Sequence, residues 1–216
     1  MTVRRLPVYL LLDTSGSMHG EPIESVNIGL RAMLSTLRQN TYARESVFLC
    51  IVTFDSKINE VLPLTALDQI TLPEIVCPPS GGTFLGEGLE DICARVERDF
   101  KQPNGDDEGD WKPLLFIMTD GKPTDTMVYE DVIPRIKALP FAAVIACAAG
   151  PKSVPDQLKQ LTDKVVSLDT MDSSSFSTFF KWVSATVTAG NENGEAANTS
   201  NNRELPPPPP EVQIVI

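Results

Sequence analysis

The stretch LPVYLLLDTSGSM, residues 6–18, decides the fold. It opens with an apolar run from Leu6 to Leu12 and then changes at once to oxygen-bearing side chains, beginning with Asp13. A short apolar run without alternation is typical of a strand that is buried on both faces, as in a parallel sheet. The residues that follow the run then lie at the carboxyl end of a strand, where open parallel sheets bind their ligands.

Four more segments share this character, and helical patterns separate them. The five strand-like segments cover residues 7–12, 47–54, 113–118, 141–148 and 165–168. Apolar side chains recur at helical spacing after Pro22, over residues 85–100, 127–139 and 176–187, and briefly after Pro155. Strands that alternate with helices predict one α/β domain with a doubly wound, mostly parallel sheet and helices on both faces.

Two local features qualify this regular pattern. The brief run KINEVL, residues 57–62, is expected to pair with the preceding strand as one antiparallel edge of the sheet. Pro134 lies inside the third helical pattern, where it removes a backbone donor and crowds the preceding turn. We expect Pro134 to kink that helix or to break it in two.

The composition changes after residue 188, so we predict a domain over residues 1–188 and an appendage over 189–216. Residues 189–204 are rich in Asn, Glu, Ser and Thr, which is typical of a flexible linker. Five prolines at 206–210 predict a stiff polyproline spacer. Two interpretations stay open for the terminal EVQIVI, residues 211–216. It is either a disordered tail or a strand that adds to a sheet edge, in the same chain or by exchange with a partner.

The charge balance argues against whole classes of partner. The chain has 216 residues, with 18 Lys and Arg against 29 Asp and Glu, and its formal net charge is −11. A strongly acidic chain is a poor candidate for coating nucleic acid or an anionic membrane. No apolar stretch approaches the roughly 18 residues that a membrane-spanning helix requires. We therefore expect a cytoplasmic protein that binds neither nucleic acid nor membrane.

The cysteines and the acidic loop each have an ordinary interpretation. The four cysteines form no CxxC pair and His19 is the single histidine, which argues against a zinc cluster. We expect the cysteines to be small core residues of a reduced protein. The acidic run PNGDDEGD, residues 103–110, is either a second cation site or partner patch, or a solvated loop. The solvated loop is the favoured interpretation.

Oxygen-bearing side chains gather in three loops of the predicted sheet. Asp13, Ser15 and Ser17 follow the first strand, and Asp120 follows the strand at 113–118. Thr83 stands in the loop SGGT, directly before a predicted helix. Two carboxylates and three hydroxyls form a hard ligand set, suited to Mg²⁺ or Mn²⁺. With so few carboxylates, the cation would tend to accept another anionic oxygen from outside.

These motifs resemble the von Willebrand factor A (VWA) domain and its metal-ion-dependent adhesion site. The resemblance covers roughly residues 6–188 and is carried by DTSGS, by the later Gly-Gly-Thr and by Thr-Asp-Gly. It implies that Asp13, Ser15, Ser17, Thr83 and Asp120 hold the ion, in a non-enzymatic module that binds a carboxylate of a protein partner. Lys122 and Asp125 are weaker candidates for the rim of the site.

The stretches RRLPVYLLLDTSGSM, PPSGGTFLGEGL and FIMTDGKPTD look most similar to bacterial TerY-like VWA proteins of tellurite-resistance and stress operons. That resemblance implies a stress-response system and association with a protein kinase and a PP2C-type phosphatase.

Two alternatives compete with the metal site. Asp13 and Thr83 could simply cap the helices that follow them. A Mg²⁺-dependent phosphotransfer enzyme of the haloacid-dehalogenase type also uses an aspartate at the end of a strand. That chemistry normally needs a second carboxylate two residues later, and Ser15 stands there. The chain also has no GxxxxGK[ST] phosphate loop.

Overall fold

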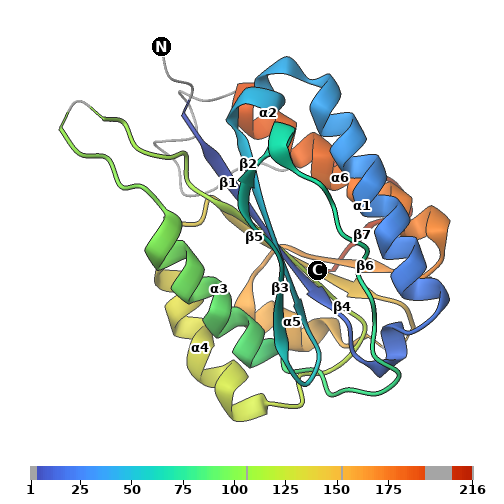
Figure 1. Ribbon diagram of the computed structural model, residues 1–216. Coiled ribbons are helices and arrows are strands. Elements are labelled where there is room, and N and C mark those ends of the chain that lie inside the picture. The colour runs from blue at the N-terminus through green and yellow to red at the C-terminus, as the bar shows by residue number, and fades with distance from the viewer. Residues whose placement is uncertain (1–3, 106, 152, 193–205, 216) are drawn as a thin grey trace.

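Seven strands form one sheet in the order β3-β2-β1-β4-β5-β6-β7 (Figure 1). The computed structural model describes residues 4–105, 107–151, 153–192 and 206–215. The strands are β1 Leu6–Asp13, β2 Val47–Phe54, β3 Ile58–Ala66, β4 Leu114–Thr119, β5 Ala143–Ala149, β6 Val165–Leu168 and β7 Gln213–Ile214. The helices are α1 Glu21–Gln39, α2 Thr41–Ser46, α3 Leu85–Asp99, α4 Thr126–Ala138, α5 Pro155–Leu161 and α6 Ser173–Glu192, with 3₁₀ turns η1 Gly16–Met18 and η2 Leu67–Gln69.

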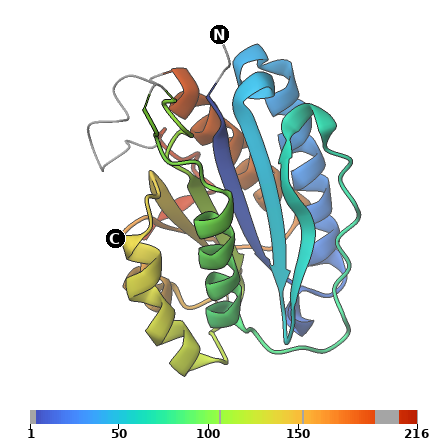
Figure 2. The ribbon, with the colours of Figure 1, turned by 60° about the vertical axis from the view of Figure 1, so that its left-hand side comes forward.

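Helices cover both faces of this sheet, as the continuous apolar strands predict. All eight residues of β1 are buried. Leu10 of β1 packs in a core with apolar residues of α1 and α6, whereas Leu11 packs in a second core with residues of α3, α4 and α5. Figures 1 and 2 show the two helix layers on opposite sides of the strands. The predicted doubly wound α/β fold is confirmed.

The central strands are parallel, and their carboxyl ends meet at one edge. Asp13 of β1 pairs with Phe54 of β2, and Leu12 of β1 pairs with Met118 of β4. The loops that follow β1, β2 and β4 therefore start side by side. They lie at the lower end of the molecule in Figure 1, opposite the N-terminus.

Both edges of the sheet are antiparallel, where the sequence pattern predicted one such edge. β3 pairs with β2 as expected, although it is longer than the predicted segment 57–62. β7 pairs with β6 through Val166 with Ile214 and Ser167 with Gln213, so part of the segment 211–216 adds to the sheet of its own chain. Val212, just before β7, is buried in the core of the α1 and α6 face. Burial of this side chain anchors the short strand.

Helix α4 corrects the expectation that Pro134 breaks a helix in two. The helix continues through Pro134 from Thr126 to Ala138. Pro134 leaves the carbonyl of Glu130 without its helical donor, but both residues are exposed, so water can satisfy that oxygen. Helix α6 also runs four residues past position 188, to Glu192. Residues 193–205, the rest of the predicted linker, lie outside the described residues.

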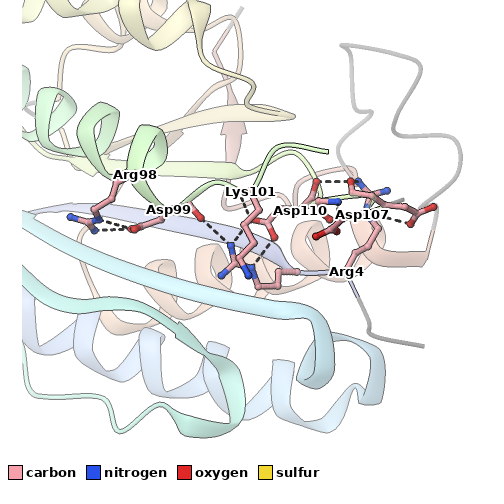
Figure 3. A network of polar contacts seen from close by, with 9 residues as sticks. Arg4, Arg98, Asp99, Lys101, Asp107 and Asp110 are labelled. Atoms are coloured by element: carbon pink, nitrogen blue, oxygen red, sulfur yellow. Dashed lines mark hydrogen bonds and ion pairs between the residues drawn. The ribbon is translucent and has the colours of Figure 1, made fainter. Parts of the chain in front are cut away.

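The acidic loop at 103–110 is tied to the start of β1 (Figure 3). Asp110 is buried and accepts hydrogen bonds from Arg5 through both carboxylate oxygens, at 2.8 and 2.6 Å. Asp107 accepts a bond from the amide of Gly109 and is exposed. The expectation of a solvated loop therefore holds for Asp107 and is wrong for Asp110, because Arg5 supplies a cation at the base of the loop.

Candidate metal site

Asp13, the last residue of β1, is held between two strand ends. Its Oδ1 accepts a 2.7 Å hydrogen bond from the amide of Ser15. Its Oδ2 accepts a 2.6 Å bond from the hydroxyl of Thr119, the last residue of the neighbouring β4. Because β1 and β4 are parallel partners, these two strand ends meet in register and fix the orientation of the carboxylate.

The serines of the first loop join Asp13 to the β4 loop. The hydroxyls of Ser15 and Ser17 share a 3.2 Å hydrogen bond. Ser17 lies in the 3₁₀ turn η1, and its hydroxyl donates a 2.9 Å bond to Oδ1 of Asp120. The structure thus brings Asp13, Ser15, Ser17 and Asp120 together from two loops that are about 100 residues apart in the chain.

Thr83, which the sequence pattern adds from a third loop, approaches the same place. It is buried, and Phe84 separates it from the start of α3. A Cβ atom built on Gly121 would lie 3.4 Å from the Thr83 hydroxyl oxygen. The Thr83 hydroxyl therefore lies beside Gly121, the residue that follows Asp120. All five predicted ligand positions lie at this edge of the sheet.

Burial and charge act on this cluster in a way that favours a cation. Asp13 is 1% exposed, and its partners at Ser15 and Thr119 are uncharged groups. Burial raises the pKa of the Asp13 carboxyl from 3.8 to about 6, and the charge of Asp120 adds to that rise. The hydrogen bonds from Ser15 and Thr119 oppose it. A buried carboxylate whose pKa is raised gains from a nearby positive charge.

Three nearby residues were not among the predicted ligands. Asp55 follows β2, is buried, and accepts a 3.2 Å bond from the Thr14 hydroxyl. Its position after a buried strand is the same signal that singled out Asp13. Thr119 belongs to the quoted Thr-Asp-Gly motif but was not assigned a role. The Cys77 thiol donates to the carbonyls of Thr14 and Ser15, at 3.0 and 3.1 Å, and no sequence signal predicts that contact.

The thiol of Cys77 stays protonated beside the cluster. Burial raises its pKa to about 11, and the negative charges of Asp13, Asp55 and Asp120 add to the rise. A neutral thiol is a poor metal ligand, since the thiolate is the binding form. All four cysteines are buried and unpaired with each other, as predicted for core residues.

The helix-cap alternative is contradicted by the structure. The N-cap of α1 is Gly20 and that of α3 is Phe84, and neither residue makes a side-chain capping bond. Ser15 caps the short turn η1 without a side-chain capping bond. Asp13 and Thr83 are therefore not explained by capping.

The ligand chemistry available here is that of oxygen, with hydroxyls in the majority. Within residues 4–105, 107–151, 153–192 and 206–215, no group of three or more His, Cys, Asp or Glu side chains could hold a metal ion. This argues against the second cation site considered for the acidic loop, as far as the described residues extend. At this edge of the sheet, the two carboxylates and three hydroxyls of the three loops fit a hard cation that keeps part of its coordination shell for water or another ligand.

The chain is similar to a known protein family over most of its length. The sequence model of the von Willebrand factor type A domain matches residues 8–182. No curated protein matches the sequence.

Among the helices of the described residues, none has the length and apolar character of a membrane span.

Solved structures with the same fold include proteins from a mussel, a Catenulispora and a Sulfolobus species. Proximal thread matrix protein 1 from the mussel byssus, described with a zinc-occupied MIDAS motif, is 20% identical with a TM-score of 0.61, over 86% of this chain and 48% of that one. The von Willebrand factor type A protein of Catenulispora acidiphila is 14% identical with a TM-score of 0.63, over 85% and 43%. The ArnB paralog VWA2 of Sulfolobus acidocaldarius is 17% identical with a TM-score of 0.58, over 86% and 46%. This chain thus spans less than half the length of these structures, and the similarity shows a shared fold.

Proposed function

The chain belongs to the von Willebrand factor type A domain family, and we propose that it is a cation-dependent protein-binding module. In this proposal Asp13, Ser15, Ser17, Thr83 and Asp120 hold one divalent cation. A carboxylate of a protein partner completes the coordination shell. The family is one of metal-dependent interaction modules of the MIDAS type, and this chain fills each position of the motif.

One observation carries the proposal: the hydrogen-bonded row from Thr119 through Asp13, Ser15 and Ser17 to Asp120. Each step in that row is a contact of 2.6 to 3.2 Å between oxygen-bearing side chains, or the amide of Ser15. Side chains held by one another need little reordering when a cation arrives, so less free energy is spent on organising them. The row supports a preassembled oxygen site.

The same row favours Mg²⁺ or Mn²⁺ over a softer cation. Its members are carboxylate and hydroxyl oxygens, and the nearest thiol, Cys77, directs its hydrogen toward backbone carbonyls. Mg²⁺ keeps several waters and is usually bound by one or two carboxylates. The zinc in the mussel protein's MIDAS motif belongs to that protein, and zinc is therefore included as a competitor in the test.

The open side of the site supports a protein partner. Ser17 is exposed while Asp13 and Ser15 are buried, so a bound cation is reached from solvent past Ser17. An incoming carboxylate brings one negative charge to a cation that only two protein carboxylates surround. The coordination bond would supply affinity, and the neighbouring loops would supply specificity.

The phosphotransfer alternative has less support. A nucleophilic aspartate needs an acid or base next to it, and the position two residues after Asp13 is the hydroxyl of Ser15. Oδ1 of Asp13 accepts from the amide of Ser15 and Oδ2 accepts from Thr119, so the carboxylate is held in place by both oxygens. We propose binding without turnover. Mg²⁺-dependent hydrolysis of a phosphoester that disappears in Asp13→Asn would contradict this.

The experiment is a titration of the purified chain with Mg²⁺, Mn²⁺ and Zn²⁺ by calorimetry. Wild type is expected to bind one equivalent, Asp13→Ala to bind none, and Thr83→Val to bind more weakly. Asp131→Asn is the matched control, because it removes an exposed carboxylate from α4. Binding by Asp13→Ala equal to that of wild type would exclude these residues as the site.

The cellular setting is proposed from the resemblance to TerY-like proteins. We propose a cytoplasmic role in a bacterial tellurite-resistance or stress system, with a protein kinase and a PP2C-type phosphatase as partners. Affinity capture from the host with Mg²⁺ or with EDTA tests this. Partners that remain in EDTA, or in the Asp13→Ala chain with Mg²⁺, would show that the metal site does not bind them.

Exchange of the C-terminal segment between copies stays a prediction. β7 pairs here with β6 of its own chain. If a second copy can supply the same strand, the full chain will show a concentration-dependent dimer that a chain lacking residues 207–216 does not form. Measuring the mass in solution of the full and the shortened chain distinguishes exchange between copies from pairing within one chain.

A further inference from the structure

We infer that Thr124 is a positioning residue for Thr83, and that it joins the loop of Asp120 to the loop of Thr83 as one unit. The inference rests on the proposed function, because Thr83 matters only if its hydroxyl binds the cation. Thr124 is an exposed residue four positions after Asp120. It belongs to none of the five ligand positions.

Thr124 and Thr83 hold each other through a reciprocal pair of hydrogen bonds. The amide of Thr83 donates to the Thr124 hydroxyl at 3.1 Å. The amide of Thr124 donates in return to the carbonyl of Thr83 at 2.9 Å. A pair of bonds in opposite directions fixes both the distance and the orientation of the two segments, which a single bond would not do.

A second contact ties the same two loops a few residues further on. Oδ2 of Asp125 accepts a 2.8 Å bond from the amide of Glu87, in the first turn of α3. Gly86 makes this approach possible, since a Cβ atom there would lie 2.4 Å from the amide nitrogen of Tyr129. The start of α3 and the start of α4 are therefore in direct contact, and both carry a loop of the site.

The amides of Thr83 and its two neighbours have hydrogen-bond partners in two different loops. Gly82 donates to the Ser56 hydroxyl at 2.7 Å, and Phe84 donates to the carbonyl of Asp55 at 2.9 Å. Both of these partners follow β2. Thr83 itself is bonded to Thr124, in the loop of Asp120. Thr124 is thus the contact that couples the Thr83 hydroxyl to the β4 side of the site.

The physical consequence is a lower cost of binding. A threonine on a mobile loop would have to be ordered when the cation binds, and that ordering subtracts from the affinity. With Thr124 in place, the Thr83 hydroxyl already lies beside Gly121. Loss of one hydrogen bond of this kind is worth about 1 to 1.4 kcal/mol, which corresponds to a reduction in affinity of about five- to tenfold.

The test is the Mg²⁺ or Mn²⁺ affinity of three single variants measured by calorimetry. Thr124→Val removes the acceptor hydroxyl at nearly constant shape and is expected to weaken binding about five- to tenfold. Thr124→Ser restores a hydroxyl and is expected to bind within about twofold of wild type. Thr126→Val is the matched control, because Thr126 is an exposed residue two positions away.

A double-mutant cycle separates a positioning role from general damage to the fold. If Thr124 acts through Thr83, then Thr124→Val will cost little affinity in a chain that already carries Thr83→Val. Urea unfolding of each metal-free variant is measured alongside; we expect Thr124→Val to unfold at a slightly lower urea concentration than Thr126→Val, because it alone loses a hydrogen bond, and to be fully folded under the conditions of the titration. Additive losses in the cycle would overturn the inference.

The failure of this inference is distinguishable from failure of the proposed function. If wild type binds no cation, or if Asp13→Ala binds as well as wild type, the proposed metal site is wrong. If wild type binds, Asp13→Ala does not, and Thr124→Val binds like wild type, the site stands and the role of Thr124 is wrong.

Discussion

A buried carboxylate lies at each end of β1, Asp110 of the acidic loop at one end and Asp13 of the strand at the other, and the partners of the two acids differ. At the amino end, Asp110 accepts two hydrogen bonds from the guanidinium of Arg5, which directly precedes the strand. At the carboxyl end, Asp13 accepts from the amide of Ser15 and the hydroxyl of Thr119. One acid has a cation within the chain, and the partners of the other are neutral.

The Asp110 end is built as a closed structural network (Figure 3). The amide of Lys101 donates to Oδ2 of Asp110 at 2.9 Å, in addition to the bonds from Arg5. Arg5 also donates to the carbonyl of Asp99, and Arg4 donates to three carbonyls of the acidic loop while its guanidinium lies 3.8 Å over the Trp111 ring. These contacts tie the chain before β1 to the loop before β4.

The difference shows how a buried acid that stabilises the fold can be told from a buried acid that is available to bind a cation. A buried carboxylate costs free energy unless a cation or enough hydrogen bonds stabilise its charge. Arg5 supplies the stabilising cation for Asp110. The hydrogen-bond partners of Asp13 are neutral, and burial raises the pKa of its carboxyl to about 6. We therefore expect mutations at the two ends to change different quantities.

The largest effect is expected from Asp110→Ala. It leaves the guanidinium of Arg5 partly buried without its carboxylate, and it removes the acceptor for the amide of Lys101. We expect a loss of about 3 kcal/mol in the free energy of unfolding, measured with urea. Glu108→Ala is the control, since its 3.8 Å ion pair with Arg4 is exposed on the Glu108 side, and it should cost less than about 0.5 kcal/mol.

The Asp110→Ala variant should lose stability without losing affinity for metal. At a temperature where this variant is folded, it should bind Mg²⁺ as tightly as wild type. A large loss of metal affinity in Asp110→Ala would show that the two ends of β1 do not act separately.

The next effect, that of Asp13→Asn, is an increase in the free energy of unfolding instead of a loss. In metal-free protein at about pH 8, Asp13→Asn is expected to be more stable than wild type by about 2 kcal/mol. The folded pKa of Asp13 lies above the ordinary value of 3.8, so the folded state binds its proton more tightly than the unfolded state does. The resulting stability is present below pH 3.8 and is lost as the pH rises through about 6. The advantage of Asp13→Asn should therefore shrink as the pH falls.

Added Mg²⁺ should reverse this order. A ligand at about 100 times its dissociation constant stabilises the folded state by roughly 2.7 kcal/mol, and only wild type should gain it. The measurement is a set of urea unfolding curves with Mg²⁺ and with EDTA, at about pH 8 and about pH 5. An Asp13→Asn chain that is less stable than wild type in EDTA at both pH values would contradict a charge cost at this position.

Much of this arrangement could be predicted from sequence, because it follows from periodicity and order along the chain. Apolar runs that end in Asp13 and Asp120 indicate parallel strands with their carboxyl ends at one edge, and the structure confirms that sheet. Once the strands are parallel neighbours, the loops after them must lie together. The motif residue Ser17 then reaches Asp120, and Ser15 is bonded to Ser17.

The contacts that sequence patterns did not predict depend on loop conformation or on distant pairing. The bond from the Cys77 thiol to the carbonyl of Thr14 spans 63 positions, and the Arg5 to Asp110 pair spans 105. No periodic signal connects such residues. Of the two outcomes expected for Pro134, a kink or a break, the break does not occur, since α4 runs from Thr126 to Ala138.

The smallest effect that still tests the comparison is expected from Arg5→Lys. Lysine keeps the positive charge beside Asp110 but cannot donate two parallel bonds to the carboxylate, nor reach the Asp99 carbonyl at the same time. We expect a loss of about 1 kcal/mol in the free energy of unfolding, compared with about 3 for Asp110→Ala.

The matched control for Arg5→Lys is Arg98→Lys. Arg98 makes two 2.7 Å bonds to the carboxylate of Asp99, but its side chain is 61% exposed. An exposed pair of this kind is worth little, so Arg98→Lys should change the free energy of unfolding by less than about 0.5 kcal/mol. If Arg5→Lys costs as little as Arg98→Lys, charge alone stabilises Asp110 and the fork geometry adds nothing. A cost close to that of Asp110→Ala would mean that the geometry, rather than the charge, separates Asp110 from Asp13.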